Sequence, residues 1–218
     1  RRAALARPAD PAQPWALVTT PRAQNAPRAL SLEILCRVLE NARLLTPEQH
    51  REAVVRQDKE RAKVLRAKTG VARTRRRGAE EPVHPAEVLV AMGFGAGGDP
   101  RFPLTERTIM QALAADVGLP FIDLDPLELD AKLAPQYLSR PFAKKHGALV
   151  IAADPTTVTV AVSDPLDAQL ADDIRTYVKR EPKTVLATPS DVGRLIAEFY
   201  GFRGAVTAGV GDLTKDRY

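Results

Sequence analysis

The residue types best suited to metal binding or nucleophilic attack are few in this chain and far apart. It holds one cysteine, Cys36, and three histidines, His50, His84 and His146. A zinc site needs several such ligands at short, converging spacings, and these four residues share none. Cys36 lies on a helical apolar stripe, which favours a core thiol over a nucleophile. We therefore predict no metal, no cofactor and no catalytic residue.

Phosphate binding has one candidate loop, the glycine-dense segment at residues 93–98. A nucleotide-binding phosphate loop follows a strand, and its glycines lead into Lys and then Ser or Thr at the start of a helix. This segment instead follows a predicted helix, and the chain contains no Gly-Lys-Ser or Gly-Lys-Thr. It also contains no Gly-x-Ser-x-Gly, the elbow of many hydrolases. We interpret the segment as a plain loop and predict that this chain is not an enzyme.

Charge is divided unevenly along the chain. Residues 1–79 carry 18 Lys and Arg against 7 Asp and Glu, whereas residues 80–218 carry 14 against 20. A basic half can bind nucleic acid, anionic lipid or an acidic protein, so charge alone does not choose among them. With 5% aromatic residues there is little surface for base stacking, so nucleic acid is not the expected partner and stays a second alternative. The candidate contacts for a partner or an anion form one basic run, Arg73, Arg75, Arg76 and Arg77.

The sequence contains no predicted membrane span. Its longest apolar stretches, such as residues 148–153, are much shorter than the roughly 20 residues of a spanning helix, and no charged-then-apolar leader opens the chain. A single cysteine fits a reducing compartment, so we expect a cytoplasmic protein. Because the chain begins at Arg1 rather than Met, we also expect it to be part of a longer protein.

The first half of the chain is predicted to be helical. Apolar residues recur there at spacings of three and four, which places them on one face of a helix. Thr46 followed by Pro47 and Gln49 predicts a capping box, and Gly93 and Gly118 fit the left-handed residue that ends a helix. The predicted helices span residues 30–43, 47–68, 84–92 and 105–117.

The second half mixes strands and helices. Residues 157–163 alternate between apolar and polar or small side chains, which predicts a strand, and the turn chemistry of Asp154 and Pro155 joins it to residues 148–152 as a hairpin. The other predicted elements are a short strand at 121–122, helical turns at 135–138 and 141–146, a helix opened by Asp164 and Pro165, a strand at 183–187 and a last helix capped by Ser190.

Together these elements predict an α+β fold. The small α/β part is expected to hold a mixed, three- to four-stranded sheet flanked by helices. The predicted parts are a flexible, proline-rich lead-in at 1–29, a helical subdomain at 30–117 with loops at 70–83 and 94–103, an α/β subdomain at 118–201, and a linker or tail at 202–218.

Several runs in the second half resemble one known family as a set. They are residues 118–124 (GLPFIDL), 138–145 (LSRPFAKK), 161–167 (AVSDPLD) and the terminal helix at 189–200. In order and spacing they resemble the N-terminal domain of type II secretion and type IV pilus assembly ATPases, often called the MshE N-terminal domain. Upstream, residues 34–57 and 84–116 resemble two degenerate copies of the family's 24-residue helix-turn-helix motif.

This resemblance implies a docking and regulatory domain without catalysis. Such a domain binds the inner-membrane platform of a secretion or pilus machine through a cytoplasmic partner protein. The implied location is therefore the cytoplasm, peripheral to the inner membrane through partners. ATP hydrolysis would belong to a motor domain, whose phosphate loop this chain lacks.

Some members of the family also bind cyclic di-GMP through the two repeated motifs, which gives a ligand-sensor domain as the first alternative. On this resemblance the candidate ligand contacts are Gln57, His84 and Gly93. The arginines that lead the two motifs are replaced here, by Ile34 and His84, and three of the four motif glycines are missing. Cation contact to phosphate and close backbone approach are therefore largely lost.

Overall fold

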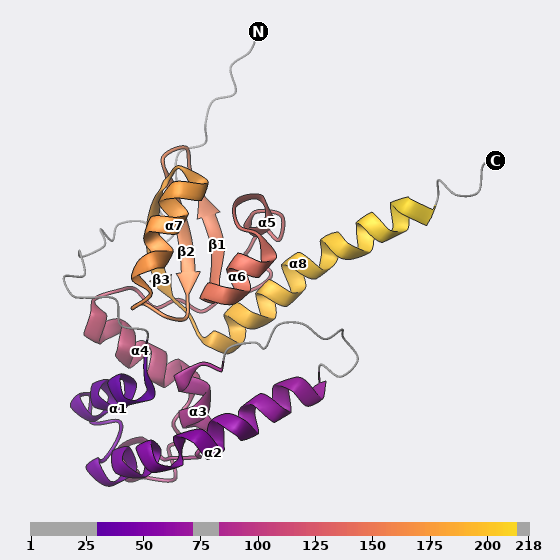
Figure 1. The fold of residues 1–218 in the computed structure, drawn as a ribbon. Coiled ribbons are helices and arrows are strands. Elements are labelled where there is room, and N and C mark those ends of the chain that lie inside the picture. Colours follow the sequence, from indigo (N-terminus) through magenta and orange to yellow (C-terminus); the bar gives the residue numbers. More distant parts are fainter. Residues whose placement is uncertain (1–29, 72–82, 213–218) are drawn as a thin grey trace.

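The chain folds into a helical subdomain (α1–α4) packed against an α/β subdomain (β1–β3 with α5–α8), as Figure 1 shows. The computed structural model describes residues 30–71 and 83–212. The predicted α+β class is confirmed. The predicted lead-in at 1–29 and the basic run of Arg73, Arg75, Arg76 and Arg77 lie outside the described residues.

Helix caps that are predicted from the sequence mark where helices of the helical subdomain begin. It begins with α1 (Leu32–Asn41) and α2 (Pro47–Val71). Between them, the Gln49 N–H donates to Thr46 Oγ1 (3.2 Å) and the Thr46 N–H donates to Gln49 Oε1 (3.0 Å), so the predicted capping box is confirmed. The elements that follow are α3 (Pro85–Ala91), the 3₁₀ turn η2 (Ala96–Gly98) and α4 (Glu106–Val117).

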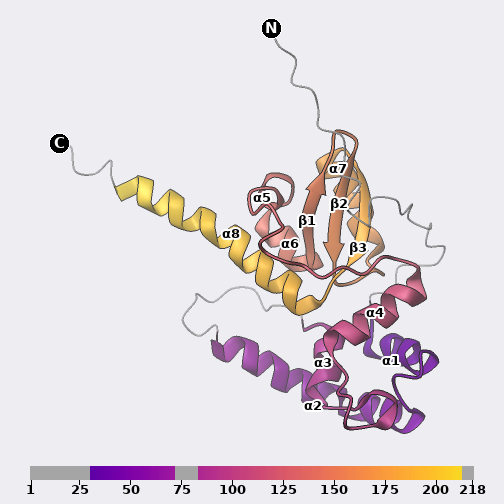
Figure 2. The ribbon, with the colours of Figure 1, turned by 180° about the vertical axis from the view of Figure 1, so that it is seen from behind.

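Helices α1, α3 and α4 each contribute an apolar face to the core of this subdomain. The largest of these side chains are fully buried: Leu35, Leu39, Leu89, Ile109 and Leu113. Cys36 is buried among them, as predicted. The second half of α2 is mostly exposed and extends away from the body, on the same side as α8 (Figure 2).

The α/β subdomain contains a mixed sheet whose order in space is β1-β2-β3. Strands β1 (Ala148–Ala153) and β2 (Thr157–Val162) form the predicted antiparallel hairpin, and β3 (Glu181–Leu186) pairs with β2 in parallel. The helices are α5 (Ala134–Tyr137), α6 (Arg140–His146), α7 (Ala168–Val178) and α8 (Pro189–Asp212).

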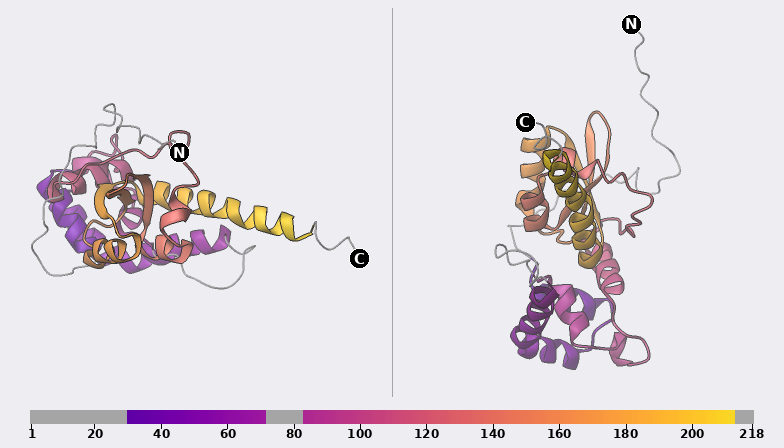
Figure 3. Two further views of the ribbon diagram at one scale, coloured as in Figure 1. Left: turned by 90° about the horizontal axis from the view of Figure 1, so that it is seen from above. Right: turned by 90° about the vertical axis from the view of Figure 1, so that its right-hand side faces the viewer.

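Alternate side chains of the strands enter two different cores, because successive residues of a strand point to opposite faces. On one face Val158, Val160 and Val162 join Leu170 and Ile174 of α7 and the core of the helical subdomain. On the other face lies a second cluster, which includes Leu149, Ile151, Val185 and the α8 residues Val192, Leu195, Ile196 and Phe199. The sheet is therefore a middle layer, with α8 on the outside of one face, and Figure 3 shows α8 continuing beyond it.

Two predicted elements of the α/β subdomain differ from the structure. Helix α7 begins at Ala168 rather than at Asp164, because Asp167 is its N-cap and accepts from the Gln169 and Leu170 N–H groups (3.2 Å each). At residues 121–122 no full strand forms: Phe121 makes a single parallel bridge to Leu186.

The last helix continues through residues 202–212, where we had predicted a linker. This segment contains glycines but no proline, and glycine weakens a helix by about 1 kcal/mol without removing the hydrogen-bond donor that proline removes. Within residues 30–71 and 83–212, no helix is long and apolar enough to cross a membrane.

Candidate functional site

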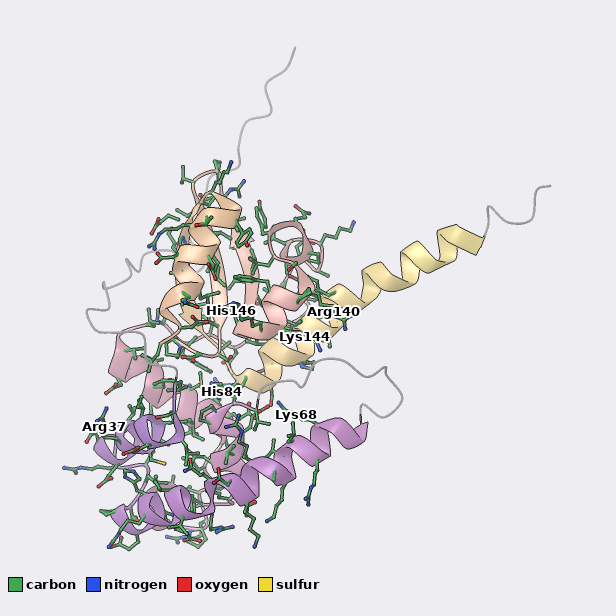
Figure 4. All side chains as sticks on the ribbon, in the orientation of Figure 1. Arg37, Lys68, His84, Arg140, Lys144 and His146 are labelled. Carbon is green, nitrogen blue, oxygen red and sulfur yellow. The ribbon has the colours of Figure 1, made fainter. Side chains whose placement is uncertain are left out.

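A cavity of about 530 Å³ lies where the two subdomains meet. Its walls come from α2 and α3 on one side and from the end of α6, the residues after β2 and the start of α8 on the other. This volume falls in the range of small-molecule sites in proteins. Figure 4 labels His84 and Lys68 on the helical side and Lys144 and His146 on α6.

His84 joins the two sides of this junction cavity. As the N-cap of α3, its Nδ1 accepts from the Ala86 N–H (3.1 Å), so the ring proton is on Nε2, which donates to the backbone oxygen of Ser163 (3.0 Å). Burial lowers the pKa of His84 from 6.5 to about 4, and nearby Lys68 acts in the same direction. The imidazole is therefore neutral near pH 7, and both of its nitrogens are occupied.

Glu87 fastens α3 to α2 beside His84. Its carboxylate accepts from the His84 N–H (3.0 Å), which completes a capping box, and pairs with Lys68 Nζ at 2.7 Å. The Glu87 side chain is only 9% exposed. This carboxylate is thus fully engaged by protein donors and leaves little negative charge for the cavity.

His146 lies on the opposite wall, at the end of α6. Its Nδ1 is 2.6 Å from Asp167 Oδ2, and its side chain is 6% exposed. The ring of Phe142 lies against the imidazole, with the two ring centroids 4.5 Å apart. Gly147, at φ 55°, ends α6 directly after this histidine and turns the chain into β1.

The structure brings together two of the three residues that the motif resemblance proposed. Gln57 and His84 both line the junction cavity. Gly93 does not: it is exposed at φ 72° and follows the end of α3. His146 and Asp167 were missed as a pair, because 21 residues separate them and no spacing rule joins them. The AVSDPLD run that contains Asp167 was the signal nearest to this pair.

Comparison with known proteins finds a family match for the α/β part. Residues 117–206 match the family model of the MshEN domain. This segment is similar to MshEN domains. The chain is also similar to the type IV pilus assembly ATPase TfpB of Acinetobacter baylyi, with 25% identity over 105 residues. That alignment covers 48% of this chain and 18% of TfpB, so the chain spans less than a fifth of the relative's length.

Two solved structures are among the similar folds. A structure of MshE with cdg has a TM-score of 0.47 and 19% identity, covering 76% of this chain and 98% of that one. The N-terminal domain of XpsE has a TM-score of 0.39 and 18% identity, covering 62% and 93%. The segment that matches the MshEN model supplies only one wall of the junction cavity, since α2 and α3 precede residue 117.

Proposed function

We propose that this chain is a docking and regulatory domain, without catalysis, of a type II secretion or type IV pilus assembly ATPase. The match of residues 117–206 to the MshEN model is the observation that carries this proposal, and the similarity to TfpB supports it. In this function the domain binds the inner-membrane platform of the machine through a cytoplasmic partner protein. The chain is then cytoplasmic and peripheral to the membrane.

Capture of purified platform proteins by residues 1–218 tests the docking function. Leu127 and Tyr177 are large side chains of the α/β subdomain that are 94% and 74% exposed. Leu127→Asp should have little effect on folding, whereas Tyr177→Asp also removes an edge-on ring contact with Phe142, so its folding is checked first. If Leu127 or Tyr177 belongs to the docking surface, its Asp variant captures less partner. The control, Lys132→Gln, changes an exposed charged residue instead of an apolar one and captures as much as the parent chain. A folded chain that captures none of the platform's cytoplasmic proteins overturns the proposal.

Cyclic di-GMP binding is the second candidate function. One observation favours it: Gln57 and His84, one from each repeated motif, line the same cavity. The structure disfavours an arginine-like role for His84, because its ring is neutral near pH 7 and both ring nitrogens already have protein partners. Calorimetric titration tests this candidate, and the absence of heat at high micromolar cyclic di-GMP removes it.

A further inference from the structure

The junction cavity has an apolar part as well as a charged rim. Leu30 and Leu32 of the helical subdomain line it, together with Val88 of α3 and with Val192 and Ile196 of α8. Each of these residues is at most 7% exposed. Such a lining suits an apolar or aromatic side chain, and a volume of about 530 Å³ accommodates one.

Gly193 keeps the α8 wall of this cavity open. It lies inside the helix and lines the cavity, and a Cβ added to it meets no atom within 4 Å. A glycine inside a helix is less favourable than an alanine, and close packing against the described residues does not require one here. The missing side chain therefore leaves room on the cavity side of α8 that no described residue fills.

The described part of the chain starts at the rim of this cavity. Leu30 is the first described residue, it lines the cavity, and its N–H donates to the Asp164 carboxylate (3.2 Å). This contact fixes the point at which the lead-in, residues 1–29, joins the body. Trp15 precedes Leu30 by 15 residues, and an extended chain of that length spans up to about 50 Å. Trp15 is thus within reach of every wall of the cavity.

The lead-in contains one segment that suits the cavity. Trp15 is the single tryptophan of the chain, and Leu17 and Val18 follow it closely. Residues 11–21 around it include no Asp, Glu, Lys or Arg, so the segment brings no charge with it. A buried indole N–H needs an acceptor, and the side-chain oxygens of Gln57 and Asp58 on the α2 wall are of the right kind.

We infer that the junction cavity is the docking site of the chain's own lead-in, with Trp15 as the side chain that enters it. A tether of this length sets an effective concentration on the order of 1 mM, so an intrinsic Kd of about 0.1 mM keeps roughly nine chains in ten docked. The docked segment occupies the space that any other ligand of the cavity needs. The lead-in thus acts as an internal competitor, whether or not the chain docks on a secretion or pilus platform.

Fluorescence of Trp15 tests this docking, because no other tryptophan contributes to the signal. Quenching by acrylamide is measured in residues 1–218 and in an isolated peptide of residues 1–29, which has no cavity to enter. With nine chains in ten docked, we expect quenching about tenfold weaker in the chain than in the peptide, and an emission maximum at shorter wavelength. Equal quenching in the two samples overturns the inference.

A matched pair of variants then locates the site. Gly193→Leu fills the cavity from α8 with little risk to folding, because the new side chain starts in open space and leucine favours a helix. We expect it to return Trp15 quenching to the level of the peptide. Gly201→Leu changes a glycine of the same helix that also has open surroundings but is not part of the cavity wall, and it should leave Trp15 protected.

Two further outcomes contradict the proposed docking. Protection of Trp15 that survives Gly193→Leu places the tryptophan elsewhere on the body. Protection that disappears on dilution assigns the site to a second copy of the chain instead of the chain's own cavity. A failure to capture platform proteins changes none of these fluorescence readouts, so the docking of Trp15 and the proposed function are tested separately.

Discussion

The imidazole of His84 donates from Nε2 to the backbone oxygen of Ser163, 79 residues further along the chain. One residue thus caps α3 and connects it to the residue that follows β2. A second connection runs beside it, since the Leu30 N–H donates to the Asp164 carboxylate (3.2 Å). The subdomains are joined by these specific polar contacts as well as by a shared apolar core.

Replacing His84 with Asn separates its two tasks. Asn remains a good N-cap, but its side chain is too short to reach Ser163, so a partly buried carbonyl loses its donor. We expect a loss of about 1 to 2 kcal/mol in the free energy of unfolding, measured in urea. Thr105→Asn, at the N-cap of α4, is the matched control, and we expect it to change the free energy of unfolding by a few tenths of a kcal/mol at most. Equal effects of the two changes would contradict the connection.

Stability also depends on pH through His84. Its pKa is about 4 in the folded chain and 6.5 when unperturbed, so between these values the unfolded chain binds a proton that the folded chain does not. The contribution of neutral His84 is therefore complete above pH 6.5 and is lost as the pH falls toward 4, by up to about 1.4 kcal/mol per pH unit. Between pH 7 and pH 4.5 this loss, roughly 2 to 3 kcal/mol, exceeds the expected advantage of the parent chain over His84→Asn, about 1 to 2 kcal/mol, so the difference in the free energy of unfolding should vanish or change sign. A parallel decline of both proteins would rule this out.

Cys36 should be inert in the native protein. Its side chain is fully buried, and burial, reinforced by Glu40 and Glu33, raises the pKa of the thiol from 9.0 to about 12. Because the thiolate is the reactive form, we expect a thiol reagent at pH 8 to react on the order of a thousandfold more slowly than in denaturant. Similar modification rates in the two conditions would show that the α1 core opens readily.

Gly93 and Gly147 both have a positive φ, so an Ala substitution at each allows the cost of backbone strain to be compared with the added cost of a steric clash. A Cβ added at Gly93 (φ 72°) meets nothing within 4 Å, whereas one at Gly147 (φ 55°) collides with Oγ of Ser163. We expect Gly93→Ala to cost about 1 to 2 kcal/mol from backbone strain alone, and Gly147→Ala to cost more, because Ser163 Oγ must also rotate away and lose its contact with the Gly147 oxygen. Urea unfolding of the pair measures the difference. If Gly147→Ala were the milder change, the packing of Ser163 against the end of α6 would be disproved.

The hydroxyl of Tyr200 ties α8 to the short helix α5. It lies 2.9 Å from the Leu138 oxygen and 3.2 Å from the Ala134 oxygen, and burial raises the pKa of the phenol to about 12. Tyr200→Phe keeps the ring and removes the donor, so we expect a loss of about 1 to 2 kcal/mol. Hydrogen exchange should show earlier opening of α5 than of β1. Unchanged protection of α5 would mean that the hydroxyl does not hold it.

Local signals predicted most of the fold. Thr46, Gly93 and Gly118 each act within a turn or two of their own position, so their residue types predict a cap or an end without knowledge of the rest of the chain. The hairpin followed from the alternation of residues 157–163 in the same way. The start of α7 was missed because Asp164 and Asp167 are both good caps, and the contact that engages Asp164 comes from Leu30, far away in sequence.

The candidate site was much less predictable. The resemblance indicated Gln57 and His84, but the junction cavity is closed by Lys145, His146 and Asp167, which no spacing rule joins to the helical half. The charge state of His84 was also hidden in the sequence, because the pKa of its ring is lowered mainly by burial where the two subdomains meet. Contacts between distant segments determine a site of this kind, and periodicity does not encode them.

Helix α8 has its first turns in the wall of the junction cavity, through Val192 and Ile196, and then runs on to Asp212 outside the body. Its 24 residues make a rod about 36 Å long. A tilt of only about 5° at the cavity end would carry the far end through roughly 3 Å, by the length of such a helix. A small rearrangement between the subdomains at the cavity therefore becomes a larger displacement at the outer end of α8, where the helix leaves the body.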